Sequence, residues 1–318
     1  MNKLMTVTAV AVALVGMSAT LASAQESEGS VGLILGSSGS PFYQAMQCGA
    51  MERAEELGLE LTVSAADRFA ADAQIPVVDA LTAAAPDVAA IVPTDMQALI
   101  APMRQMAERG TKVMTVDQTL ADVSFLETQI LTDNEAGGAM AAEQLAGLIG
   151  SAGKVLVITQ PPGSLAQDAR TAGFEAELAA NYPDVEYLGA QYQSNDPQRA
   201  AEIVTSTLSA HPDLAGIFAT NDQGAIGAIT GLRQAGAVGN VKMVAYDAAS
   251  AEVAALKNGE IQALIAQNPN EQGRLAMDIA AQLIAGEEVE PMTTAEIVAI
   301  TADQPELADQ YEYIAGCM

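Results

Sequence analysis

The chain has 318 residues, half of them hydrophobic, which is enough for about two domains with substantial cores. Only 13 Lys and Arg oppose 40 Asp and Glu, so the formal net charge is -27 and the surface would repel nucleic acids and anionic membranes. One histidine and two cysteines are too few for the common zinc sites or an iron–sulfur cluster. Aromatic residues make up 4% of the chain, so any ring that follows a strand is a candidate for a binding site.

The first 24 residues have the pattern of a secretory signal peptide. Lys3 precedes an uncharged, mostly apolar run, and the segment ends in Ala22-Ser23-Ala24, a small-residue cleavage pattern. The apolar run is shorter than the ~20 residues that a membrane span needs. We therefore expect cleavage after Ala24, export to the periplasm and a soluble mature chain that begins at Gln25.

The two cysteines are expected to form a disulfide, because an exported protein meets an oxidising compartment. Cys48 lies in the first predicted helix, and Cys317 is next to last in the chain. A bridge between them would attach the C-terminal tail to the N-terminal half of the protein. The alternative is two unpaired thiols.

Short apolar runs alternate with helical patterns along the whole mature chain. In the first half, strands are predicted at 31–35, 61–63, 88–92 and 113–116, with helices at 41–58, 72–85 and 96–109. In the second half, helices separate strands predicted at 155–159, 187–190, 215–219, 241–246 and 261–266. Apolar strands that alternate with helices are typical of a parallel sheet covered on both faces. We therefore predict an α/β protein with two doubly wound parallel-sheet lobes.

The segments that follow the predicted strands lack the common catalytic and cofactor motifs. Residues 36–40 follow the first strand, but they have neither the G-x-G-x-x-G spacing nor the Gly-Lys-Ser/Thr of a P-loop. A G-x-S-x-G elbow is also missing from the sequence. His211 precedes Pro212 in a predicted turn away from the strand ends, which argues against a His-based triad. We predict no enzymatic activity, no cofactor and no metal, with a sugar hydrolase as the enzymatic alternative.

The residues at the strand ends form an ordered series. In chain order they are Ser40-Pro41-Phe42-Tyr43, Val92-Pro93-Thr94-Asp95, Thr115-Val116-Asp117-Gln118, Leu131-Thr132-Asp133-Asn134, Arg170-Thr171-Ala172-Gly173-Phe174, Phe218-Ala219-Thr220-Asn221-Asp222, Val244-Ala245-Tyr246-Asp247 and Ala266-Gln267-Asn268-Pro269. From about residue 30 to residue 300, this series resembles the ribose-binding-protein-like family of periplasmic sugar-binding proteins, which serve ABC transporters.

The resemblance implies the type I periplasmic binding protein fold, with two lobes joined by a three-stranded hinge and a sugar between them. The N-terminal lobe would comprise residues 25–131 and about 268–293. The C-terminal lobe and tail would comprise residues 132–267 and about 294–318.

The resemblance also implies a set of ligand-binding residues. They are Ser40, Phe42, Tyr43, Asp117 and Gln118 in the first lobe, Arg170, Asn195, Asn221 and Asp247 in the second, and Gln267 at a crossing. Aromatic rings can cover the apolar faces of a sugar, and amide or charged groups can hold its hydroxyls. We expect Asn134 to order the hinge, and Asp95 to cap a helix that begins at Met96.

The chain departs from the ribose-type pattern at several of these positions. That pattern has Asp-Arg where this chain has Asp117-Gln118, and an aromatic residue where this chain has Asn195. Stacking on a sugar would then depend on Phe42 and Tyr43. The expected ligand is therefore a pentose, a hexose or a small polyol.

The expected partners are an ABC transporter permease and the sugar itself, with a chemoreceptor as a further candidate and the monomer as the expected state. A non-sugar ligand, such as a nucleoside or a furanosyl signal molecule, is the alternative. A sugar-responsive repressor has a similar core, but it would carry a basic DNA-binding module instead of a signal peptide on an acidic chain.

Overall fold

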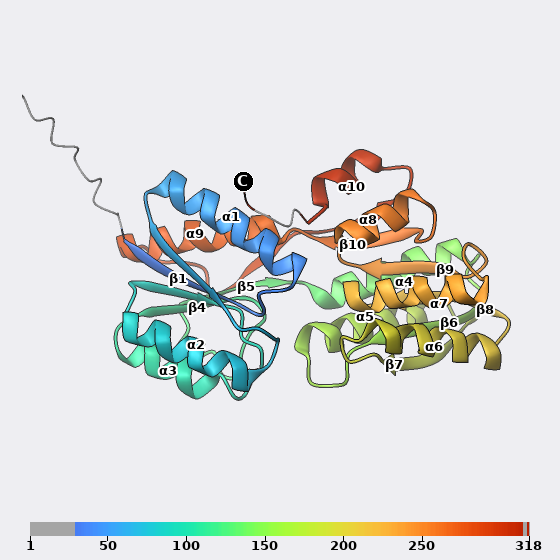
Figure 1. Ribbon diagram of the computed structural model, residues 1–318, viewed down its shortest axis with the longest axis horizontal. Coiled ribbons are helices and arrows are strands. Elements are labelled where there is room, and N and C mark those ends of the chain that lie inside the picture. The colour runs from blue at the N-terminus through green and yellow to red at the C-terminus, as the bar shows by residue number, and fades with distance from the viewer. Residues whose placement is uncertain (1–28, 314–316, 318) are drawn as a thin grey trace, which may run out of the picture.

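The protein has two α/β lobes, which lie on the left and on the right of Figure 1. The computed structural model describes residues 29–313 and 317, so the predicted signal peptide lies outside the described residues. Each lobe is built on a six-stranded sheet with helices on both faces. This confirms the predicted fold class. Within the described residues, no helix is both long enough and apolar enough to cross a membrane.

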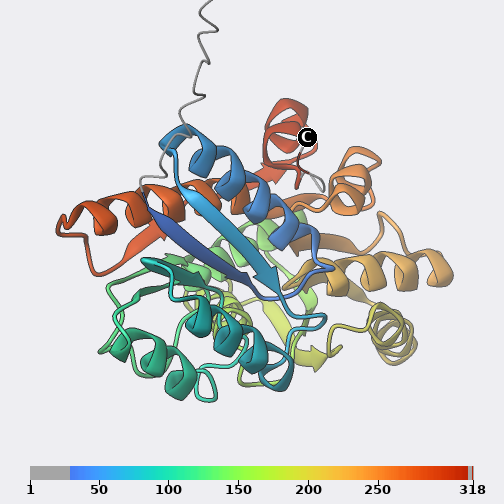
Figure 2. The ribbon, with the colours of Figure 1, turned by 60° about the vertical axis from the view of Figure 1, so that its left-hand side comes forward.

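The N-terminal lobe has an all-parallel sheet with the strand order β11-β5-β4-β3-β1-β2. Its strands are β1 (Ser30–Leu35), β2 (Glu60–Ala65), β3 (Val88–Ile91), β4 (Lys112–Asp117), β5 (Thr128–Thr132) and β11 (Thr293–Ala295). Its helices are α1 (Pro41–Leu57), α2 (Ala71–Ala84), α3 (Ile100–Glu108) and α9 (Pro269–Ala285). Met46 of α1 and Met277 of α9 pack on one face of the sheet, and Val78 of α2 and Met103 of α3 pack on the other. The side-by-side placement of α1 and α9 is visible in Figures 1 and 2.

The C-terminal lobe repeats this plan with the strand order β12-β10-β9-β8-β6-β7. Its strands are β6 (Gly153–Thr159), β7 (Val185–Tyr192), β8 (Leu214–Ala219), β9 (Lys242–Tyr246), β10 (Ala263–Gln267) and β12 (Ile297–Thr301). Its helices are α4 (Asn134–Leu148), α5 (Leu165–Asn181), α6 (Pro197–Ala210), α7 (Asp222–Ala235), α8 (Ser250–Lys257) and α10 (Pro305–Tyr311). Helices α4 and α5 cover one face of this sheet, and α6, α7 and α8 cover the other.

The chain passes between the lobes three times: after β5, after β10 and between β11 and β12. Strand β10 runs toward the crossing and β12 runs away from it, so these two strands pair antiparallel, unlike the rest of their sheet. Two crossings are joined by hydrogen bonds. The Thr132 hydroxyl donates to the Gln267 side-chain oxygen at 2.9 Å and accepts from the Gln272 amide at 3.1 Å. The hinge therefore lies beside the carboxyl ends of β5 and β10.

The predicted helix at 96–109 is wrong at its start, because α3 begins only at Ile100. The Asp95 carboxylate accepts hydrogen bonds from the amides two and three residues later, both at 2.8 Å, and so caps a turn rather than a helix. Pro102 has no N–H to donate to the carbonyl of residue 98, which disfavours helix before Ile100, although Pro76 is accommodated inside α2. Residues 96–99 form a turn instead.

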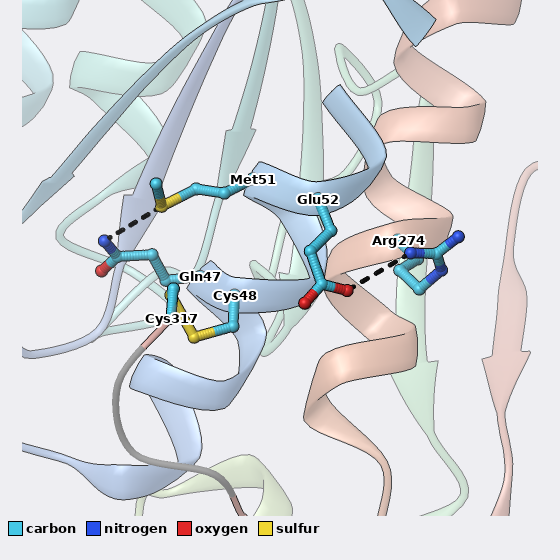
Figure 3. The surroundings of a disulfide bond; sticks show 6 residues. All are labelled: Gln47, Cys48, Met51, Glu52, Arg274 and Cys317. Atoms are coloured by element: carbon cyan, nitrogen blue, oxygen red, sulfur yellow. Dashed lines mark hydrogen bonds and ion pairs between the residues drawn. A yellow bond between two sulfur atoms is a disulfide. The ribbon is translucent and has the colours of Figure 1, made fainter. Parts of the chain in front are cut away.

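A disulfide joins Cys48 of α1 to Cys317 of the C-terminal tail, with their Cα atoms 5.0 Å apart (Figure 3). On the same helix, Glu52 faces Arg274 of α9, with 3.6 Å between the charged groups. The bridge closes a sequence separation of 269 residues and attaches the tail to the N-terminal lobe.

The disulfide predicts a simple thiol count. The unfolded, unreduced protein should show no free thiol, and the reduced protein should show two, because the chain has two cysteines. The double variant C48S/C317S should lose about 2–4 kcal/mol of unfolding free energy, because the bridge restricts the unfolded chain. Thiol titration and urea unfolding measure both effects. Two reactive thiols in the unreduced protein would contradict the bridge.

Candidate binding site

A cavity of about 570 Å³ is lined by side chains that follow the strands of both lobes. This volume lies within the usual range for small-molecule sites. All ten residues that the sequence predicted as ligand-binding lie in its lining: Ser40, Phe42, Tyr43, Asp117, Gln118, Arg170, Asn195, Asn221, Asp247 and Gln267. The structure therefore brings the predicted set together at one place.

Arg170, on α5, is the buried cation of this cavity, with 3% of its surface exposed. Its Nε donates to the Asn134 side-chain oxygen and its Nη1 to the Thr220 carbonyl oxygen, both at 2.8 Å. The guanidinium also lies 3.6 Å from the centre of the Tyr246 ring, where a cation is attracted by the face of the ring. Asn134 thus holds Arg170, and it also donates to the Thr132 carbonyl beside the hinge at 3.1 Å, as expected for a residue that orders the crossing.

Two glycines allow the helix that carries Arg170 to lie close to α4. A Cβ on Gly138 of α4 would lie 1.9 Å from the Arg170 carbonyl oxygen, and one on Gly173 of α5 would lie 2.0 Å from the Glu135 carbonyl oxygen. Any larger residue at either position would push the two helices apart. The close approach of α4 and α5 therefore sets where the guanidinium enters the cavity.

Arg170 stays charged although it is buried. Burial lowers the pKa of Arg170, but the electrostatic effects of Tyr246, Asp247 and Asp117 outweigh burial and raise its pKa overall. Among the described residues, Arg170 forms no ion pair with Asp117 or Asp247, because no guanidinium nitrogen lies within 4.0 Å of either carboxylate oxygen. The cation and the two carboxylates thus line the same cavity without neutralising one another directly, and a guanidinium keeps further N–H donors for a ligand.

Asp117, the last residue of β4, presents a carboxylate from the N-terminal lobe. The Tyr43 hydroxyl donates to Asp117 Oδ2 at 3.0 Å, and the Gln118 amide approaches the same oxygen at 3.4 Å. Burial raises the pKa of Asp117 to about 6, although Arg170 and the hydrogen bonds from Tyr43 and Gln118 oppose that rise.

Asp247, directly after β9, presents a carboxylate from the C-terminal lobe. Its Oδ1 accepts hydrogen bonds from the Gln267 amide at 2.8 Å and from the Tyr313 hydroxyl at 2.9 Å. Both Asp117 and Asp247 have positive φ angles, 65° and 89°, which are strained for residues with a Cβ. The same strain at the same kind of position in both lobes points to a requirement for the direction of these side chains.

Asn221 and Asn195 form a small polar network in the second lobe. Asn221 Oδ1 caps α7 by accepting from the Gly224 amide, and it also accepts from the Gln193 side chain, both at 3.0 Å. Asn221 Nδ2 donates to Asn195 Oδ1 at 3.0 Å. The loop residue Asn195 is therefore held inside the cavity lining and is more than a turn residue.

The lining also contains residues that the sequence motifs did not predict, among them Phe69 and Gln160. Phe69 lies parallel to the Tyr43 ring, with 6.3 Å between the ring centres, and so adds a third ring to Phe42 and Tyr43. Phe69 lies four residues after β2, and Gln160 comes directly after β6. Reading the residues after every strand, and not only after those with familiar motifs, would have found both.

The described residues contain no group of three His, Cys, Asp or Glu side chains that could hold a metal ion. The protein has two lobes joined by three crossings, and residues of both lobes line one cavity. This arrangement is typical of binding proteins whose two lobes close about a hinge.

The chain belongs to the family described as the periplasmic binding protein domain, whose model matches residues 31–288. The family places the protein in the periplasm. The chain is 30% identical over 279 residues to the ribose import binding protein of Salmonella typhimurium, covering 88% of this chain and 93% of that one. The predicted resemblance is confirmed.

Solved structures of sugar-binding proteins have the same fold. A solute-binding protein of Agrobacterium vitis, bound with alpha-D-tagatopyranose, has a TM-score of 0.86 and 32% identity, and covers 90% of this chain and 99% of its own. A periplasmic solute-binding protein of Actinobacillus succinogenes, with bound D-allose, has a TM-score of 0.83 and 26% identity. This match covers 87% of the present chain and 99% of the solved one.

The raised pKa of Asp117 predicts a pH-dependent stability. The folded protein keeps a proton on this carboxyl up to about pH 6, whereas the unfolded chain releases it near 3.8. This group therefore makes the folded state less stable as the pH rises from 4 to 7. The wild type should lose about 2 kcal/mol more unfolding free energy than Asp117→Asn over this range, measured by urea unfolding without ligand. An equal pH dependence in both proteins would show that the pKa is not raised.

Proposed function

We propose that this protein is the substrate-binding component of an ABC importer and closes its two lobes around one neutral monosaccharide. The observation that carries the proposal is the single cavity lined by Asp117 and Tyr43 from one lobe and by Arg170 and Asp247 from the other. A ligand that contacts both groups favours the closed arrangement, because only that arrangement offers both sets of contacts. The protein would thus present a closed form to its permease only when loaded.

The chemistry of the lining suits a sugar. Phe42 and Phe69 offer apolar ring surface for C–H groups, while carboxylates, amides and a guanidinium offer strong hydrogen bonds to hydroxyls. The charged lining residues are the carboxylates Asp67, Asp117, Asp222 and Asp247 and the guanidinium groups Arg68 and Arg170. The excess of carboxylates disfavours sugar phosphates and uronates, since like charges repel at low dielectric.

Related proteins support a pentose, a hexose or a small polyol as the ligand. Ribose import binding proteins and a xylitol-binding protein are among the relatives, and similar solved structures hold alpha-D-tagatopyranose, D-arabinose or D-allose. We further propose that the signal peptide is cleaved after Ala24, that the mature protein is a monomer, and that it binds without chemical conversion of the sugar. A chemoreceptor that reads the closed form is a further candidate partner.

A thermal-shift screen tests the ligand class. The panel contains D-ribose, D-arabinose, D-allose, D-tagatose and xylitol. Adenosine represents the alternative class of nucleoside ligands, and ribose 5-phosphate is the anionic control. A neutral sugar or polyol should raise the melting temperature in a concentration-dependent way, because it binds only the folded state. Stabilisation by adenosine alone would favour the alternative ligand class, and no stabilisation by any neutral sugar would contradict the proposal.

Asp247→Ala should weaken binding of the best sugar in this panel by about 10- to 100-fold, because the variant loses hydrogen bonds to a charged group. Isothermal titration calorimetry measures the dissociation constant. Asp213→Ala is the matched control, because Asp213 is not part of the lining. The Asp213 side chain is 66% exposed, and its carboxylate forms an ion pair with Lys154 at 2.9 Å. Unchanged affinity in Asp247→Ala would refute binding in this cavity.

A further inference from the structure

We propose that Tyr313, in the C-terminal tail, positions the Asp247 carboxylate for the ligand, and that the Cys48–Cys317 disulfide holds Tyr313 in place. The inference rests on the proposed role of the cavity in sugar binding. Tyr313 does not line the cavity itself, so it is a positioning residue that acts through its hydrogen bond to Asp247.

Tyr313 is built into the protein interior at the junction of the lobes. Only 2% of its surface is exposed, although it follows the last helix of the chain. Its amide donates to the Ala248 carbonyl oxygen at 3.0 Å, next to Asp247 in the C-terminal lobe. Its ring meets the edge of Phe42 of the N-terminal lobe, with 5.6 Å between ring centres and 76° between ring planes. Tyr313 therefore touches a proposed ligand residue in each lobe.

The Tyr313 hydroxyl fixes the direction of the Asp247 carboxylate. Asp247 Oδ1 accepts two hydrogen bonds, from Tyr313 at 2.9 Å and from Gln267 at 2.8 Å. Within the described residues, no protein donor bonds to Oδ2, which leaves that oxygen for a ligand. Burial and the nearby Asp247 carboxylate raise the pKa of Tyr313, so the phenol remains a hydrogen-bond donor at neutral pH.

The disulfide anchors the segment that carries Tyr313. Helix α10 lies on the C-terminal lobe, and Cys317, four residues after Tyr313, is bonded to Cys48 in the middle of α1. Four residues of chain span at most about 14 Å. The bridge therefore keeps Tyr313 close to the N-terminal lobe whatever the angle between the lobes.

Tyr313→Phe tests the positioning role, because it removes only the hydroxyl and keeps the ring against Phe42. It should weaken binding of the best sugar of the panel about tenfold by calorimetry, since a hydrogen bond to a charged group is lost. Tyr311→Phe is the matched control. Tyr311 is buried in the same tail, but its hydroxyl donates at 3.1 Å to Glu296, which is not part of the lining. This control should bind as the wild type does.

A double-mutant cycle separates positioning from general stability. If Tyr313 acts through Asp247, Tyr313→Phe should change the affinity less than twofold in an Asp247→Ala background, because that variant has no side-chain oxygen for the hydroxyl to position. A full tenfold loss in that background would overturn the inference, as would wild-type affinity in Tyr313→Phe alone. If no sugar binds the wild type, the proposed function fails and this inference falls with it. If sugar binds the wild type and Tyr313→Phe equally, only this inference fails.

The role of the disulfide has its own measurement, which needs no sugar. In C48S/C317S the Tyr313 amide should exchange with deuterium at least tenfold faster than in the wild type, because the tail loses one of its two anchors. The Tyr246 amide, inside the sheet, reports the general loss of unfolding free energy, so the disulfide effect is the change in the ratio of Tyr313 exchange to Tyr246 exchange between the wild type and the variant. An unchanged ratio would show that α10 alone holds the tyrosine and would overturn the anchoring role.

Discussion

A buried guanidinium is the constraint around which the site is organised. Charge removed from water is costly unless hydrogen bonds and opposite charge surround it, and Arg170 is 3% exposed. The C-terminal lobe satisfies it with Asn134, the Thr220 carbonyl and the face of Tyr246, and both lobes place carboxylates around the same cavity. The position of Arg170 in turn depends on the α4–α5 contact, which requires glycine at residue 138. The packing of two helices thus determines the electrostatics of the cavity.

One continuous set of hydrogen bonds links the hinge, the cavity and the tail. Thr132 at one crossing bonds to Gln267 at another, Gln267 bonds to Asp247, and Asp247 accepts from Tyr313. Asp247 lines the cavity, and Gln267, one of the two residues that hold its carboxylate, lies at a crossing between the lobes. A change in the angle between the lobes therefore acts on the ligand site through short, direct contacts. The disulfide at Cys48 extends this connection to α1.

The fold and most of the site could be predicted because their signals are local. Buried parallel strands appear as apolar runs, and the family resemblance of the strand-end motifs implied ten residues that all lie in the lining. Phe69 was missed because it lies four residues beyond a half-exposed strand rather than directly at its end. Tyr313 had no local signal, since its partner Asp247 lies 66 positions away. The start of α3 was misplaced because the Asp95 carboxylate caps a turn rather than a helix and Pro102 disfavours helix before Ile100.

A crystal structure of the protein with the best sugar of the panel tests the central claim most directly. The account predicts one sugar molecule in the cavity, with its hydroxyls within hydrogen-bond distance of Arg170 and of carboxylates from both lobes, Asp117 and Asp247. It also predicts that Tyr313 still donates to Asp247 Oδ1 while the sugar occupies Oδ2. A sugar bound outside the cavity, or held by residues of one lobe alone, would contradict the account.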